Sequence, residues 1–109
     1  MKQYDLYWAE LPKPIGRRPV LLLTRSAAYA YLTRITVAEV STTVRGIPVE
    51  VKLGVEEGMA RPCVANLDNV HAIAKSQLAE WIGSLRARRF VEVKRALGYA
   101  LDWVELKDL

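Results

Sequence analysis

The chain has a single cysteine, Cys63, and a single histidine, His71, among its 109 residues. One cysteine excludes an intrachain disulfide and a thiolate metal cluster, and it is typical of a reducing compartment. No apolar run approaches the ~20 residues that a membrane-spanning helix needs. The first five residues also lack the apolar stretch of a signal peptide. We therefore expect a cytoplasmic protein with no membrane partner.

The sequence also lacks a Walker loop, a dinucleotide-binding fingerprint and the ligand spacing of a zinc site. We accordingly expect neither a metal nor a cofactor. The length allows one compact domain, residues 1–109, with a modest core. Because 51% of the residues are hydrophobic, a disordered chain is excluded. The net charge of +4 and the pI near 9.4 favour an anionic partner, although many small domains are basic.

Short apolar or alternating runs, separated by turn residues, predict that most of the chain forms β-strands. Residues 35–40 and 49–53 are interpreted as a hairpin, and residues 66–71 as a polar elbow between two strands. Residues 11–16 hold two prolines and a glycine and predict a loop. The predicted strands are residues 4–10, 20–24, 35–40, 49–53, 63–65, 72–74 and a short one within 77–85.

The pattern changes to a helical one over residues 85–101. Phe90, Val93, Leu97 and Leu101 recur at the spacing of one helix face. Several short strands followed by one terminal helix predict an α+β domain, in which the helix packs on a small barrel-like sheet.

The stretch Arg17-Arg18-Pro19 runs directly into the apolar run Val20 to Thr24. A strand this apolar should be buried on both faces, so its first residues should lie at the rim of the core. Arginine carries a permanent charge and a planar set of donors that matches phosphate. From these residues alone two interpretations are open: a fixed anion-binding site, or solvated charges at the mouth of a strand.

Four segments together resemble the MazF/PemK family of ribosome-independent endoribonuclease toxins. They are Asp5-Leu6-Tyr7-Trp8, Arg18-Pro19-Val20-Leu21-Leu22, Ser41-Thr42-Thr43 and Gly46-Ile47-Pro48-Val49-Glu50-Val51. The resemblance extends from the first strand to the terminal helix. It implies an SH3-like β-barrel of five to seven short strands with a C-terminal α-helix.

The resemblance also implies catalytic residues. The arginine before the proline is catalytic in the family and corresponds to Arg18. A hydroxyl residue that acts with it corresponds to Ser41, with Thr42 next to it. Some members use an aspartate at a strand end as the general base, which corresponds to Asp68. From the residues alone, Ser41 and Thr42 are also ordinary turn hydroxyls, and Asp68 is also an ordinary turn residue.

Residues expected to contact RNA are Lys13, Arg17, Thr43, Arg45 and Asn66. Two features depart from the family pattern. The loop at residues 12–17 is shorter than in many members and lacks their histidine and glutamate. Members with the aspartate base carry an arginine two residues earlier, where this chain has Asn66.

The implied function is the toxin of a type II toxin–antitoxin pair. Such a toxin is a metal-independent, sequence-specific endoribonuclease that cleaves single-stranded RNA through attack by the 2′-hydroxyl. The implied partners are single-stranded RNA, a cognate antitoxin and a second copy of the chain in a homodimer. Two alternatives share the fold: a CcdB-like toxin that poisons gyrase, and a catalytically inactive nucleic-acid-binding module.

The sequence patterns assign no role to His71 or to the tryptophans. A lone histidine beside apolar residues is more often structural than catalytic. Trp8, Trp81 and Trp103 can stack on bases, but aromatic residues in a small domain usually fill the core.

Overall fold

The computed structural model describes all residues from Met1 to Leu109. Its six strands are β1 (Asp5–Glu10), β2 (Arg17–Leu22), β3 (Arg34–Ser41), β4 (Glu50–Leu53), β5 (Cys63–Ala74) and β6 (Leu78–Ser84). Two α-helices follow, α1 (Phe90–Leu101) and α2 (Val104–Lys107). The short 3-10 turns are η1 (Ser26–Ala30), η2 (Val55–Glu57), η3 (Lys75–Gln77) and η4 (Ala87–Arg89). No helix is long and apolar enough to cross a membrane.

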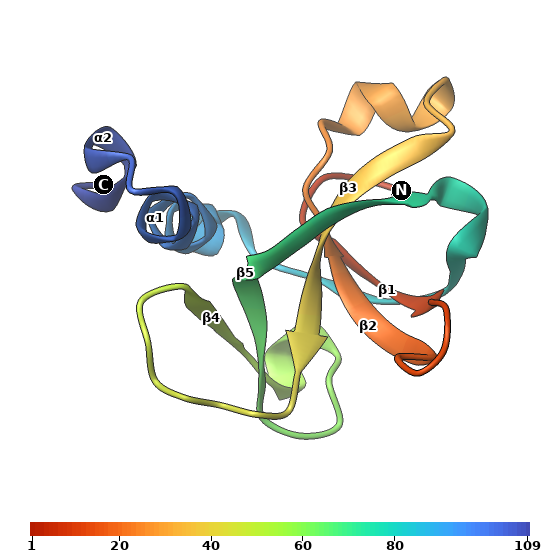
Figure 1. Cartoon of the computed structure of the whole chain (residues 1–109), viewed down its shortest axis with the longest axis horizontal. Coiled ribbons are helices and arrows are strands. Elements are labelled where there is room, and N and C mark those ends of the chain that lie inside the picture. The colour runs from red at the N-terminus through yellow and green to blue at the C-terminus, as the bar shows by residue number, and fades with distance from the viewer.

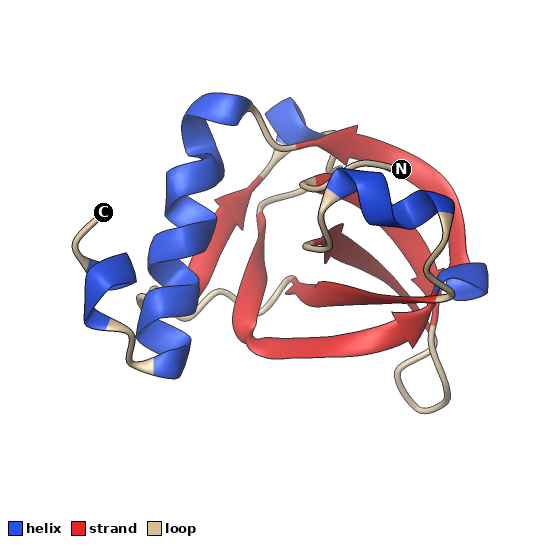
Figure 2. Ribbon diagram, turned by 90° about the horizontal axis from the view of Figure 1, so that it is seen from above, coloured by secondary structure: helices blue, strands red, loops and turns tan.

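The strands form one antiparallel sheet in the order β4-β5-β3-β2-β1-β6. Figure 2 shows this sheet curling into an open half-barrel, with α1 standing at one end. The predicted α+β architecture, a small SH3-like barrel with a C-terminal helix, is confirmed. The predicted hairpin of residues 35–40 and 49–53 is wrong, because β5 lies between β3 and β4. Alternation along a strand fixes its faces, but it does not select its neighbour.

Strand β5 is continuous, whereas the sequence suggested two strands around a polar elbow. Ala38 pairs with Val70 and Val40 pairs with Ala65, so residues 66–69 all lie opposite the single residue Glu39. The polar segment therefore forms a wide bulge that bends β5 without ending it. Figure 1 shows the bend in β5 near its label, where the strand turns and crosses β3 in this view.

Strand β2 begins at Arg17 and ends at Leu22, three residues earlier at its start than predicted. Val20 and Leu22 face one apolar cluster and Leu21 faces the other, and all three side chains are fully buried. Burying a leucine or valine side chain contributes roughly 1.5–3 kcal/mol. The prediction that this strand is covered on both faces is confirmed.

Helix α1 begins at Phe90, later than the predicted residue 85, because Ala87–Arg89 form the 3-10 turn η4. The Phe90 ring stacks on Tyr4 with 3.8 Å between ring centroids, and Val93 and Ala96 are buried. Leu101, predicted to share this buried face, is 48% exposed because the helix ends there, before Asp102 in the left-handed conformation.

The unpredicted helix α2 explains the glycine inside α1. A Cβ atom on Gly98 would lie 2.7 Å from the Cβ atom of Leu106, which is closer than side-chain atoms pack. Gly98 thus lets α2 fold back against α1, and this close approach outweighs the helix propensity lost to glycine.

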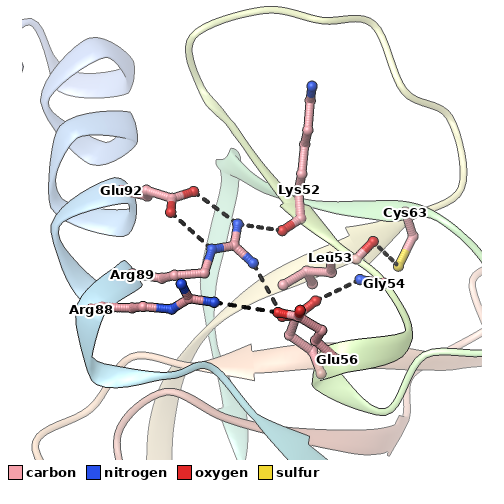
Figure 3. A network of polar contacts seen from close by, with 9 residues as sticks. Lys52, Leu53, Gly54, Glu56, Cys63, Arg88, Arg89 and Glu92 are labelled. Carbon is pink, nitrogen blue, oxygen red and sulfur yellow. Dashed lines mark hydrogen bonds and ion pairs between the residues drawn. The ribbon is translucent and has the colours of Figure 1, made fainter.

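A buried ion-pair network fastens α1 to the sheet (Figure 3). Arg89 donates to both oxygens of Glu92 at 2.8 Å and to the carbonyl oxygen of Lys52 at 2.7 Å. It also contacts Glu57 at 3.2 Å, and Glu57 is only 3% exposed. Glu57 in turn accepts the Gly54 N–H. The network joins the start of the helix to β4 and to the turn η2.

Replacing Arg89 by alanine leaves the Glu57 carboxylate buried without its cation. We expect Arg89→Ala to lower the free energy of unfolding by about 3 kcal/mol. Arg88 is the matched control, because its pair with Glu56 at 3.6 Å is exposed. Arg88→Ala should cost less than about 1 kcal/mol. Urea unfolding followed by circular dichroism measures both, and equal losses would contradict the assignment.

The same network predicts a pH dependence of stability. The hydrogen bonds from Arg89 lower the pKa of Glu92 below its ordinary value. A carboxylate whose pKa is lower in the folded state stabilises the fold above its ordinary pKa, and this contribution disappears as the pH falls through the lowered pKa. Glu92→Gln should therefore flatten part of the decline in unfolding free energy between about pH 5 and pH 3. Glu105 is an exposed glutamate without an ion pair, so Glu105→Gln should leave the dependence of unfolding free energy on pH unchanged.

Candidate active site

The candidate site lies where β2 begins and β3 ends. The register pairs Val20 with Glu39, and its continuation by two residues puts Arg18 across from Ser41. Residues two apart on a strand share a face, so Arg18 and Ser41 project from the same side of the sheet. Regular pairing between β2 and β3 stops at Val20, next to Pro19, which has no N–H to offer. By this register the two predicted residues occupy facing positions on neighbouring strands.

Arg17 does not join Arg18, because adjacent residues of a strand point to opposite faces. Its guanidinium contacts Glu10 at 2.6 Å, forms a second ion pair with Glu80, and lies over the Trp8 ring at 4.8 Å. The hydrogen bonds from Glu80 and Glu10 raise the pKa of Arg17. Its donors are thus engaged by two carboxylates of this chain.

The predicted hydroxyl residues form a tight turn after β3. The Thr43 N–H donates to Ser41 Oγ at 3.0 Å, which is the local bond that serine commonly makes at a turn. Because Ser41 Oγ accepts this bond, its own O–H remains able to donate to a ligand. Thr42 and Thr43 are exposed beside it.

The loop that carries Arg45 is held by a carboxylate. Glu50 accepts the backbone N–H groups of Arg45, Gly46 and Ile47, the shortest at 2.8 Å from Gly46. Gly46 has φ of +70°, a conformation that favours glycine. The Arg45 side chain is exposed and makes no ion pair.

Lys13 lies in the loop between β1 and β2. The Leu11 N–H donates to the Gly16 carbonyl at 3.0 Å and closes this loop. Lys13 is exposed and, like Arg45, makes no ion pair.

Asp68 and Asn66 lie on the bulge of β5. Asn66 is 8% exposed, and its Oδ1 atom accepts the Asp68 N–H at 2.8 Å. The turn contact considered for Asp68 is therefore made by Asn66. The Asp68 side chain is exposed and has no hydrogen-bond or ion-pair partner. Asp68 lies in the bulged part of β5, opposite Glu39 of the neighbouring strand β3.

Sequence reasoning missed Glu39 and assigned His71 no role in the site. Glu39 is 9% exposed and contacts Arg18 at 3.3 Å through Oε1 and His71 Nε2 at 2.8 Å through Oε2. The available signal was a carboxylate inside the apolar run of residues 35–40. A charged residue at a buried position of a strand needs hydrogen-bond or ion-pair partners.

A cavity of about 380 Å³ adjoins the Ser41–Thr42 turn. Its walls include Trp8 and Pro19 from the sheet and the segment 58–61, with Arg61 among the lining residues. A second cavity shares Trp8 and extends to Trp81, whose ring is 59% exposed. Trp81 and Trp103 are therefore surface residues, which differs from the usual core position of tryptophan.

No group of three or more histidine, cysteine, aspartate or glutamate side chains is arranged to hold a metal ion. The polar groups of the candidate site are a guanidinium, a buried carboxylate and an imidazole that contact one another, and a hydroxyl turn at the end of the same strand as the carboxylate. This set can bind an anion, donate hydrogen bonds to it and exchange a proton.

Comparison with known proteins identifies the family. A model of the "PemK-like, MazF-like toxin of type II toxin-antitoxin system" matches residues 2–101. Endoribonuclease MazF3 of Mycobacterium tuberculosis is 42% identical over 89 residues, which cover 80% of this chain and 86% of the relative. The structure of Mycobacterium tuberculosis toxin MazF-mt6 is 37% identical, has a TM-score of 0.84, and is matched over 96% of its length and 90% of this chain.

A third match is the crystal structure of MazE-MazF from Deinococcus radiodurans. It is 25% identical to this chain with a TM-score of 0.75, and it covers 93% of this chain and 94% of its own. Since the family model spans most of the sequence and the relatives agree over most of their length, the chain belongs to the PemK-like, MazF-like toxins of type II toxin–antitoxin systems.

Proposed function

We propose that this toxin is a metal-independent endoribonuclease that cleaves single-stranded RNA at short sequence motifs. The observation that carries the proposal is the juxtaposition of Arg18 with the Ser41–Thr42 turn at the open end of β2 and β3. The relatives named as endoribonucleases support the same activity. They favour it over the gyrase-poisoning toxin and over the inactive nucleic-acid-binding module.

In this reaction the RNA supplies its own nucleophile. The 2′-oxygen forms a bond to the adjacent phosphorus, and the bond from phosphorus to the 5′-oxygen breaks. The products are a 2′,3′-cyclic phosphate and a 5′-hydroxyl. Arg18 stabilises the charge that develops on the phosphate oxygens, and the Ser41 O–H donates to one of them, with Thr42 beside it. A group must also take the 2′-hydroxyl proton, and Asp68 on the β5 bulge is the candidate that the family pattern supplies.

Binding of the RNA strand is proposed for residues around this centre. Lys13 and Arg45 are exposed cations without acidic partners, so both can contact phosphates. Thr43 and Asn66 flank the turn and the bulge. A direct phosphate contact by Arg17 is less favoured, because Glu10 and Glu80 already form ion pairs with its guanidinium.

Regulation by a cognate antitoxin and assembly as a homodimer are proposed from the family. The Deinococcus radiodurans structure, which contains MazE with MazF, supports an antitoxin partner. We further propose that the toxin acts in the cytoplasm, where its RNA substrate would be found.

We expect purified protein to cleave a long RNA in the presence of EDTA. The mechanism uses the 2′-hydroxyl, so an oligonucleotide with one deoxyribose 5′ of the scissile phosphate should bind but remain uncut at that bond. End mapping of the fragments should give a cyclic phosphate and a 5′-hydroxyl. Loss of cleavage in EDTA that magnesium restores would contradict the metal-independent mechanism, and cutting of the deoxy substrate at the same bond would exclude 2′-hydroxyl attack.

The two adjacent arginines provide a matched pair of variants. Arg18→Ala should lower the single-turnover cleavage rate by about 10²–10³, the usual effect of removing one preorganised donor. Arg17→Ala removes the same charge from the opposite face and should change the rate less than about threefold, since its donors are held by carboxylates. Thermal melts establish that both variants fold. Equal rates for the two variants would remove Arg18 from the active site.

A further inference from the structure

Glu39 is a buried carboxylate within the apolar, buried part of β3. Its neighbours Val37, Ala38 and Val40 are at most 3% exposed, and the Glu39 side chain is 12% exposed. Removing a carboxylate from water is strongly unfavourable unless partners compensate for the lost hydration. Nothing in the packing of β3 requires a charge at this position. A buried charge at this position is therefore explained by the two side chains that Glu39 contacts, Arg18 and His71.

Strand β5 brings one of these groups to Glu39. Four residues of β5 lie opposite Glu39 alone, and regular pairing resumes at Val70, one residue before His71. His71 Nε2 then reaches Glu39 Oε2 at 2.8 Å, while Arg18 Nη1 lies 3.3 Å from Oε1. One carboxylate thus joins β2, β3 and β5 and orients both a guanidinium and an imidazole.

The contact also fixes which nitrogen of His71 can accept a proton. A carboxylate paired with a guanidinium is ionised and only accepts hydrogen bonds, so Nε2 carries the hydrogen of the neutral ring. The lone pair then lies on Nδ1, which makes no hydrogen bond within the protein. The His71 side chain is 39% exposed, so part of the ring is accessible to a ligand.

We propose that His71 is the general base of the RNA cleavage and that Glu39 is the positioning residue that orients His71 and Arg18 together. The inference rests on the proposed function and assigns its proton acceptor to His71 in place of Asp68. His71 Nδ1 takes the proton of the 2′-hydroxyl as the bond from the 2′-oxygen to phosphorus forms. The bond from phosphorus to the 5′-oxygen breaks, and the 5′-oxygen takes a proton from water. The imidazolium then releases its proton to solvent.

His71 suits this role better than Asp68. A neutral imidazole is the side chain whose proton affinity matches near-neutral pH, where a solvated carboxylate is a weak base. A base held by a third group is the usual arrangement at a catalytic centre. Asp68 has no partner that fixes its orientation, whereas His71 is held by the same carboxylate as the phosphate-binding Arg18.

The charged groups around His71 come from three strands. Glu39 contacts it from β3, and Arg18 lies beyond that carboxylate on β2. On β5 itself Asp68 lies three residues earlier, and Arg34 reaches across from β3 to the Ala72 carbonyl at 3.0 Å. Any pH dependence assigned to His71 must therefore be compared in variants of these groups.

The experiment measures single-turnover cleavage of an RNA oligonucleotide from pH 5 to pH 9. His71→Gln should lower the rate at neutral pH by about 10²–10³ and remove the acid limb of the profile. Affinity for the same RNA with one deoxyribose at the cleavage site should stay within about twofold, because His71 does not carry phosphate charge. Added imidazole should restore part of the activity of His71→Ala, which a purely structural role would not allow.

Glu39→Gln and Asn69→Ala complete the set. Glu39→Gln keeps the shape but not the charge, so we expect about a tenfold lower rate and a displaced acid limb. Asn69→Ala, on the exposed surface of the same bulge, should behave as wild type. A His71→Gln variant that cuts at the wild-type rate with its acid limb intact, or a His71→Ala variant without imidazole rescue, overturns the inference but leaves the nuclease in place. A wild-type protein that cuts no RNA contradicts the proposed function itself.

Discussion

Burial of β2 on both of its faces is the constraint on which the rest of the structure depends. Val20, Leu21 and Leu22 are fully enclosed between the two apolar clusters, so the strand can neither slide nor turn over without exposing one of them. The positions of Arg17 and Arg18 follow from this register. One residue of displacement would exchange their faces, and the guanidinium at the candidate site would be lost.

The faces of the strands were predictable from the sequence, but their neighbours were not. The uninterrupted apolar run after Pro19 predicted a strand covered on both sides, and the spacing of Phe90, Val93 and Leu97 predicted the helix. Alternation in residues 35–40 and 49–53 carried no information on which strand pairs with which, so the insertion of β5 between them was missed. The helix α2 was missed as well, because only the contact between Gly98 and Leu106 explains the glycine.

The residues of the candidate site that lie in short sequence motifs were predictable, whereas those brought together by strand pairing were not. Arg18 beside a rigid proline and the hydroxyl turn at Ser41 are visible as short motifs. Glu39 and His71 are 32 residues apart, and their contact depends on the register in which His71 pairs with Val37, two residues from Glu39 on β3. Arg17 is a second case, since its motif predicts a phosphate contact, and only the fold reveals that Glu10 and Glu80 compete for the same donors.

The bulge also accounts for a departure from the family pattern. Where some members carry an arginine two residues before the aspartate, this chain has Asn66, which is buried and accepts the Asp68 N–H. A guanidinium in that buried position would need a carboxylate beside it, whereas the amide satisfies the bend by itself. The bulge ends at Val70, so His71 pairs regularly with Val37 and lies diagonal to Glu39. The buried amide of Asn66 thus holds the bulge, and the polar contact between β5 and Glu39 is made beyond the bulge, by His71.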